Sequence, residues 1–362
     1  MSVCWGIPVP LLPGELFSTW LVRAAIKQGC DPLVLTSDIW PRWRTWTIDI
    51  DRCITLDRIN ILASVSGVAQ DEIINATLGP TIKEIIPDNK KAYSIFPWIL
   101  ALGSRNRKRN GGLQFCPKCI ANDKQPYFRQ QWRLAWHTSC SKHLCYLYDR
   151  CPQCNFPIEP HRLLSADRHV AICANCKLDF RLVASSAPDL AALRFQNITD
   201  EVVSRQEGYY GQERLGSSDW FFLARFFISL IRKAARGKQL FIKKIMMELG
   251  VDIYSLKTPA TGLQLELLSV YERAQLLSAT EIIMSAGPER FLHFIMGTSA
   301  SIKSLREPDQ KLPQFMERIF PPIPQNINKK KRNKRKITDK PRSYQAVLRM
   351  WARIKRKSMV PN

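Results

Sequence analysis

Eight of the eleven cysteines lie between residues 116 and 176, and most of them come in pairs separated by two residues. Two such pairs, on loops roughly 15–20 residues apart, form the usual tetrahedral site for a structural zinc ion. The spacing therefore predicts two zinc ions with four protein ligands each. They are Cys116, Cys119, Cys140 and His143 for the first, and Cys151, Cys154, Cys173 and Cys176 for the second.

One ligand of the first site has an alternative. Cys145 follows His143 by two residues and could replace it, but its spacing from Cys140 would then be four residues instead of two. We therefore favour His143 as the fourth ligand. His137 is the next candidate, although a histidine in such an apolar stretch more often packs or caps.

Both zinc sites are expected to be structural. Each quartet is complete, whereas a catalytic zinc keeps an open position beside an activating carboxylate. The sequence has no H-x-E or H-E-x-x-H motif, no G-x-x-x-x-G-K-[ST] loop and no convincing catalytic triad. We expect no enzymatic activity.

Aromatic and basic residues alternate between the two halves of the first site. The aromatic ones are expected to form the small core that a zinc module needs: Tyr127, Phe128, Trp132 and Trp136. Arg129 and Arg133 stand between them and are candidates for contacts with nucleic-acid phosphates.

The charge is strongly positive and unevenly placed. The formal net charge is +23, and residues 329–357 hold 14 Lys or Arg against one acidic residue. Residues 105–181 hold 14 basic and five acidic residues. Such an excess favours polyanionic partners, so we expect DNA binding. The candidate contacts in the tail are Lys329, Lys330, Lys331, Arg332, Lys334, Arg335, Lys336, Arg349 and Arg353.

The elements that position these residues are mainly helical. Apolar periodicity predicts helices over 15–27, within 55–78, and over 218–236, 241–249, 263–285 and 288–296. The two helices within 55–78 flank Ser66-Gly67, which is typical of a helix-turn-helix and equally of a plain packing hairpin. Apolar periodicity also predicts a short terminal helix over residues 343–357.

The predicted fold class is mainly α, multi-domain, with a central small zinc-binding module of the knuckle or ribbon type. The expected domains are an N-terminal helical domain (1–104), a tandem zinc module (105–181), a C-terminal helical domain (182–322), and a basic linker with a terminal helix (323–362). No signal peptide or membrane span is recognisable, which predicts a cytoplasmic, DNA-associated bacterial protein with reduced thiols.

The zinc region resembles the TniQ/TnsD family. Its string is FCPKCIANDKQPYFRQQWRLAWHTSCSKHLCYLYDRCPQCNFPI, which is similar to the family signature of CPxC, Y-F-R, W-R, C-x-x-H and a second CPxC. The opening PLLPGELFSTWLVRAA is similar to the family's first helix. The resemblance covers residues from about 8 to 181, and Cys145 departs from it, because an aliphatic residue is expected there.

The resemblance implies a role in DNA recombination. TniQ and TnsD proteins choose the target site of cut-and-paste transposons and perform no chemistry themselves. TnsD-like members bind a particular DNA site, whereas TniQ proper rides on an RNA-guided CRISPR complex. Both recruit an AAA+ ATPase, TnsC, which brings the transposase. The basic tail favours direct DNA contact, and the modest chain length suits the RNA-guided mode. The alternative is a zinc-containing DNA-binding transcription regulator unrelated to transposition.

Overall fold

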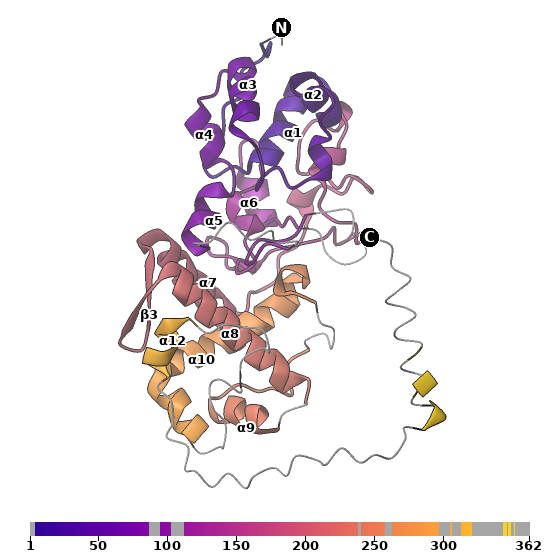
Figure 1. Ribbon diagram of the computed structural model, residues 1–362. Helices are drawn as coiled ribbons and strands as arrows, with labels where there is room; N and C mark the ends of the chain where they lie inside the picture. The colour runs from indigo at the N-terminus through magenta and orange to yellow at the C-terminus, as the bar shows by residue number, and fades with distance from the viewer. Residues whose placement is uncertain are drawn as a thin grey trace. The chain divides into compact units, whose positions relative to one another are not determined.

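The computed structural model describes residues 4–86, 95–102, 112–237, 240–257, 263–296, 305, 313–320, 343–345, 347–348 and 351. The chain divides into two compact units, Met1–Pro322 and Ile323–Asn362. Helices dominate the first unit (Figure 1). The mainly helical class predicted from the sequence is therefore confirmed. Among the described helices, none has the length and apolar character needed to cross a bilayer.

Five short helices form the N-terminal part of the first unit. They are α1 (Phe17–Lys27), α2 (Pro32–Ile39), α3 (Leu56–Ser66), α4 (Gln70–Asn75) and α5 (Gly79–Ile85), with a 3-10 turn at Thr45–Thr47. Their boundaries follow local chemistry: Pro32 is at the first position of α2, where its missing N–H costs nothing. Gly67 ends α3 with a φ of 72°. A shared core holds the first four helices together, built around Phe17, Trp20 and Leu62.

The hairpin of α3 and α4 has the two helices and the central turn that the sequence predicts. Its exposed side chains include Asp57, Asp71 and Glu72, and α4 carries no Lys or Arg. A DNA-reading helix needs basic or neutral polar groups facing phosphates and bases. The acidic surface favours the packing interpretation of this hairpin.

The central region has little regular structure. It contains α6 (Pro117–Asn122), a two-stranded ribbon of β1 (Ser139–Cys140) and β2 (Cys145–Tyr146), and 3-10 turns at Gln130–Arg133, Pro160–Arg162, Ser165–Asp167 and Phe180–Leu182. The strands are antiparallel, with Cys140 opposite Cys145. Its aromatic core includes Phe115 stacked on Phe180, with ring centroids 4.3 Å apart. This region has too few backbone hydrogen bonds between its segments to define a fold, so cross-links between the loops are needed.

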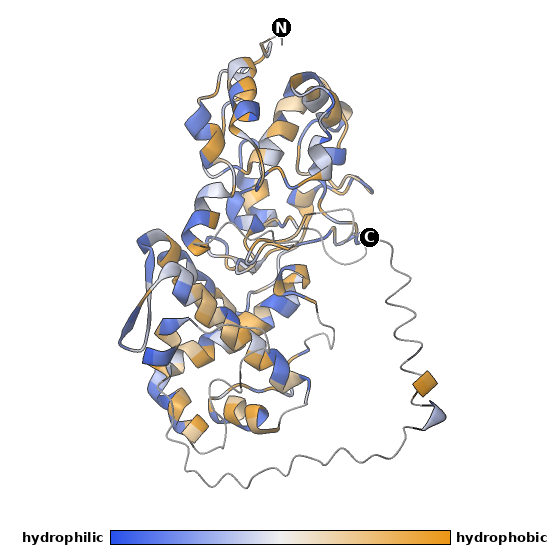
Figure 2. Ribbon diagram, viewed as in Figure 1, coloured by the Kyte–Doolittle hydropathy of each residue, from blue (hydrophilic) through white to orange (hydrophobic). Residues whose placement is uncertain are grey.

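The C-terminal part is a helical layer with one hairpin. Its elements are α7 (Leu190–Arg205), β3 (Glu207–Tyr210), β4 (Glu213–Gly216), α8 (Ser217–Ala235), α9 (Leu240–Glu248), a 3-10 turn at Leu265–Leu267, α10 (Val270–Met296) and α12 (Gln314–Ile319). Apolar residues recur along these helices (Figure 2), and those of α8 are largely buried. Gly287, with φ of 78°, breaks α10 just before Pro288.

The described residues of the second unit are few. Tyr344, Gln345, Val347, Leu348 and Trp351 are helical and exposed, in the segment where the terminal helix is predicted.

Candidate metal centres

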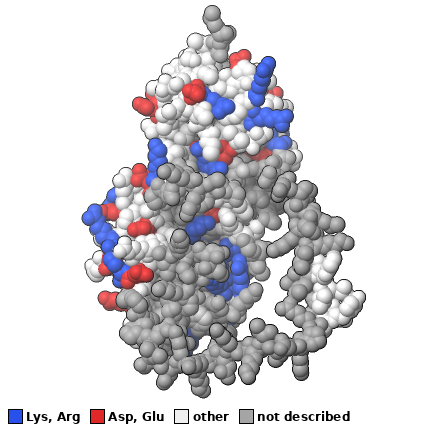
Figure 3. Space-filling model, viewed as in Figure 1, with Lys and Arg blue, Asp and Glu red and all other residues white. Residues whose placement is uncertain are grey.

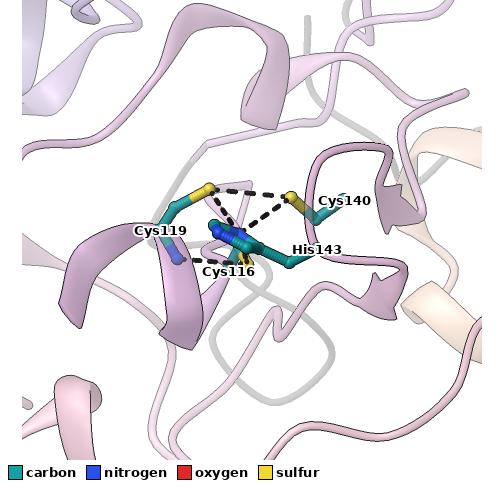
Figure 4. Close-up of side chains that lie close together, drawn as sticks. All are labelled: Cys116, Cys119, Cys140 and His143. Atoms are coloured by element: carbon teal, nitrogen blue, oxygen red, sulfur yellow. Dashed lines mark hydrogen bonds between the residues drawn. The ribbon is translucent and has the colours of Figure 1, made fainter. Parts of the chain in front are cut away.

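The first quartet comes together as the spacing predicts. The sulfur of Cys119 lies 3.6 Å from that of Cys140 and 3.2 Å from Nδ1 of His143. Cys116 and Cys140 place their sulfurs 3.5 and 3.6 Å from the same nitrogen. All four donor atoms lie within 4.8 Å of one another, and Figure 4 shows them converging from the start of α6 and from the β1–β2 hairpin.

Local backbone geometry positions these four residues. Pro117 begins α6 directly after Cys116, so the backbone N–H of Cys119 turns back and donates to the Cys116 sulfur over 3.4 Å. On the other side, the β1–β2 turn carries His143, and Leu144 closes the turn with φ of 46°. A positive φ is strained for leucine, so the surrounding structure must impose it.

The second quartet repeats this arrangement without a histidine. The sulfurs of Cys151 and Cys176 are 3.6 Å apart, as are those of Cys154 and Cys173. In each of its two C-x-x-C turns, here called knuckles, the residue after the second cysteine has a positive φ: Asn155 at 56° and Lys177 at 62°. Both knuckles thus fold the chain sharply enough to aim two thiols at one point.

The donor sets suit zinc. With bonds of about 2.3 Å to sulfur, a tetrahedral zinc site places its sulfurs roughly 3.8 Å apart, close to the separations seen here. Hydrogen bonds from Cys119 and Cys140 lower the pKa of the Cys116 thiol to about 2. Burial opposes ionisation of Cys154, yet hydrogen bonds led by the Asn175 side chain lower its pKa to about 6. The opposite shift is found at Cys119, whose pKa is raised by its contacts with Cys116 and Cys140, and at Cys151 and Cys173, whose pKa is raised by burial. Thiolate is the form that binds metal, so the match to zinc rests on the types of the donors and their separations.

Cys145 and His137, the other candidate ligands of the first site, have different surroundings. Cys145 is buried, and its sulfur is 3.6 Å from that of Cys116. His137 points elsewhere: its Nε2 is 2.8 Å from the carboxylate of Asp200 on α7. Asn122, which spacing alone did not suggest, has its side-chain amide 3.3 Å from Nε2 of His143. An outer partner of this kind fixes the orientation of a ligating imidazole.

The predicted nucleic-acid contact of Arg133 is wrong. Its side chain is fully buried and forms ion pairs with Asp51 at 2.6 Å and Asp49 at 2.7 Å. Asp51 in turn accepts two hydrogen bonds from Ser18 at the start of α1. Arg133 therefore ties the zinc region to the N-terminal helices, and it has no surface to offer a phosphate.

Arg129 is mostly enclosed as well. Its guanidinium pairs with Asp123 at 2.8 Å and lies over the rings of Tyr127 and Trp132. Its side chain is 18% exposed, so only an edge could reach a ligand. The tail candidates lie outside the described residues: Lys329, Lys330, Lys331, Arg332, Lys334, Arg335, Lys336, Arg349 and Arg353.

The residues of the predicted first helix also have structural roles. Glu15 and Arg23 form a buried, two-pronged ion pair at 2.6 and 2.7 Å. The indole of Trp20 donates to the carbonyl of Val9 at 3.0 Å. Such a buried pair holds the entering chain against α1, and neither partner is free for chemistry.

The molecule is thus a mostly helical protein built around two closed Cys/His quartets. Residues 7–147 match the family model described as TniQ. Residues 7–147 therefore form a domain of the TniQ family, which the sequence resembles, and a domain of this family indicates a protein associated with transposition. The match spans the N-terminal helices and all of the first quartet, and it ends before the second. No curated protein matches the chain.

Proposed function

We propose that this chain is a non-enzymatic adaptor that selects the target site of a cut-and-paste transposon. It binds DNA, directly or on an RNA-guided CRISPR complex, and recruits a TnsC-like AAA+ ATPase and through it the transposase. The observation that carries the proposal is the TniQ match, which covers the N-terminal helices and the first quartet as one packed region. Within that region, the backbone N–H of Leu16 donates to the carbonyl of Phe128 at 2.9 Å.

Two zinc ions, one in each quartet, would act as structural cross-links. Each quartet supplies four protein donors, so a tetrahedral ion would keep no open position for water or substrate. In the described part of the chain, groups of three or more possible metal ligands occur only at these two quartets. This supports a scaffold and not a metal-dependent nuclease.

Three lysines near the first quartet are the best described candidates for DNA contact. Lys118, Lys124 and Lys142 are exposed, and no ion pair engages them within the described residues. On the face drawn in Figure 3, the basic side chains described are interspersed with acidic ones. A strong electrostatic footprint on DNA therefore needs the basic tail in addition to these lysines.

Co-purification with the products of the neighbouring genes tests the proposal. The tagged full chain should retain the ATPase, and DNA or a guide-RNA complex should strengthen the assembly. If the chain binds DNA but none of the transposition proteins, a zinc-containing transcription regulator becomes the better account. A catalytic activity lost on mutating a defined site would also contradict the adaptor proposal.

A further inference from the structure

The first quartet has a fifth donor in contact with it. Cys145 directly faces Cys140 across the β1–β2 ribbon, and its sulfur lies 3.6 Å from that of Cys116. The same Cys116 sulfur is 3.5 Å from Nδ1 of His143. Cys145 and His143 therefore approach a common neighbour, at separations close to one edge of a tetrahedral zinc site.

The two residues face different environments. His143 is half-buried in the turn, with its outer nitrogen directed to the exposed Asn122. Cys145 is 1% exposed and begins β2. The imidazole can thus leave toward solvent without disturbing the core, whereas the buried Cys145 thiol remains beside the Cys116 sulfur.

We propose that Cys145 is a reserve ligand of the first metal centre, taking the fourth position when His143 is absent or released. The Zn–Nδ1 bond breaks and a Zn–Sγ bond forms. The thiol proton passes to the released imidazole, or to solvent where no imidazole is present. This inference rests on the proposed zinc occupancy of the first quartet.

The chemistry of the donors favours such an exchange. Thiolates are soft ligands that bind zinc at least as readily as imidazole, and Cys4 sites are common. The exchange changes the net charge of the centre from −1 to −2, because a neutral ligand gives way to an anion.

The second quartet provides an internal control. One further candidate in this segment, His169, is engaged elsewhere: Nδ1 accepts from the backbone of Ala171 at 3.3 Å and Nε2 is 3.1 Å from Arg181. Among the described residues no fifth cysteine lies beside Cys151, Cys154, Cys173 or Cys176. Loss of a ligand there has no ready substitute.

Zinc content of the purified full-length chain tests the inference. Wild type, His143→Ala and Cys145→Ala should each retain two ions, and the double variant His143→Ala/Cys145→Ala should retain one. Cys176→Ala, the control, should also fall to one. A wild type without metal in the first site would contradict the proposed occupancy. A wild type with two ions and a His143→Ala variant with one, or one that fails to fold, would overturn the reserve ligand alone.

X-ray absorption at the zinc edge gives a second readout. In His143→Ala, the nitrogen shell at about 2.0 Å should vanish and sulfur at about 2.3 Å should replace it. Two ions per chain with a light-atom ligand still present would mean that water, and not Cys145, fills the position, and the inference would fail.

Discussion

The guanidinium of Arg273 on α10 donates a 2.7 Å hydrogen bond to the side-chain oxygen of Gln114, two residues before the first cysteine of the metal centres. Its other arm donates to the carbonyl of Ala135 at 2.6 Å. Gln114 completes the contact by donating to the carbonyls of Trp132 and His137. Helix α10 thereby holds the two segments that lead into the first quartet, the one before Cys116 and the one before Cys140.

Replacing Arg273 should destabilise the first unit. Arg273→Met would leave buried carbonyl groups without donors, at a cost of about 1–3 kcal/mol for each unsatisfied group. We expect a loss of about 2–4 kcal/mol in the free energy of unfolding, measured by urea denaturation. Arg290→Met, an exposed position on the same helix, is the matched control and should change stability little. Equal stability of the two variants would contradict the bridging role.

Replacing Arg133 should be costly in a pH-dependent way. Arg133→Met leaves Asp49 and Asp51 without their buried partner, and removing one side of such a pair typically costs about 3–5 kcal/mol. Burial already raises the pKa of Asp51 to about 6 in the intact chain. An acid whose folded pKa is raised stabilises the fold when protonated, so stability falls as the pH rises toward that pKa. Arg133 lowers the pKa of Asp51, so without Arg133 this pKa rises further and the loss of stability extends to higher pH.

The destabilisation by Arg133→Met, relative to wild type at the same pH, should therefore be larger at pH 8 than at pH 6. Denaturation at both values measures it, and Arg129→Met serves as the control, since its partly exposed pair is worth less. A destabilisation that does not grow with pH would mean that the charge on the two aspartates is not the cause.

Removing one ligand of the second quartet should remove one ion and unfold the segment around that quartet, residues 151–176. Structural zinc contributes directly to folding free energy, and this segment has few backbone hydrogen bonds of its own. Cys151→Ser should lower the zinc content from two ions to one and abolish cooperative unfolding of this segment. Cys53→Ser, at an exposed cysteine, should keep both ions. A fully folded Cys151→Ser chain with two ions would refute the assignment.

The basic tail should supply affinity without sequence choice. Lysines and arginines suit phosphates, which carry charge but no sequence information. Replacing the block of seven by glutamine at constant length should flatten the dependence of log affinity on log salt by about 0.9 for each phosphate that the tail no longer neutralises. The block is Lys329, Lys330, Lys331, Arg332, Lys334, Arg335 and Lys336. Preference for target over random DNA should survive; an unchanged salt slope would show that the tail does not touch DNA.

The spacing of the metal ligands could be read from the sequence because knuckles are local: two residues between donors fix their approach. Arg133 could not be interpreted correctly, because its partners Asp49 and Asp51 are more than 80 residues away. An arginine that alternates with aromatic residues shows the same sequence pattern whether it is exposed on a surface stripe or buried in an ion pair. Nothing in the residue types at Leu144 or Lys177 signals a positive φ; the knuckle imposes it.

Helix α7 and the hairpin after it escape prediction for a different reason. Asp189 caps α7 by accepting from two backbone N–H groups, which is a recognisable start signal. The polar composition of the helix nevertheless hides its apolar face, formed by Leu193, Phe195 and Val202. The hairpin β3–β4 depends on packing, since a side chain at Gly211 would collide with Pro288.

Mapping insertion sites in a transposition reaction tests the adaptor role most directly. The reaction would contain the cognate transposase, the ATPase and target DNA, with the guide complex where one is encoded, in the presence or absence of this chain. With the chain, we predict insertions concentrated at a fixed distance from one target site; without it, insertions should be rare or scattered. An insertion pattern of the same frequency and distribution in both reactions would contradict the proposal that this protein selects the target.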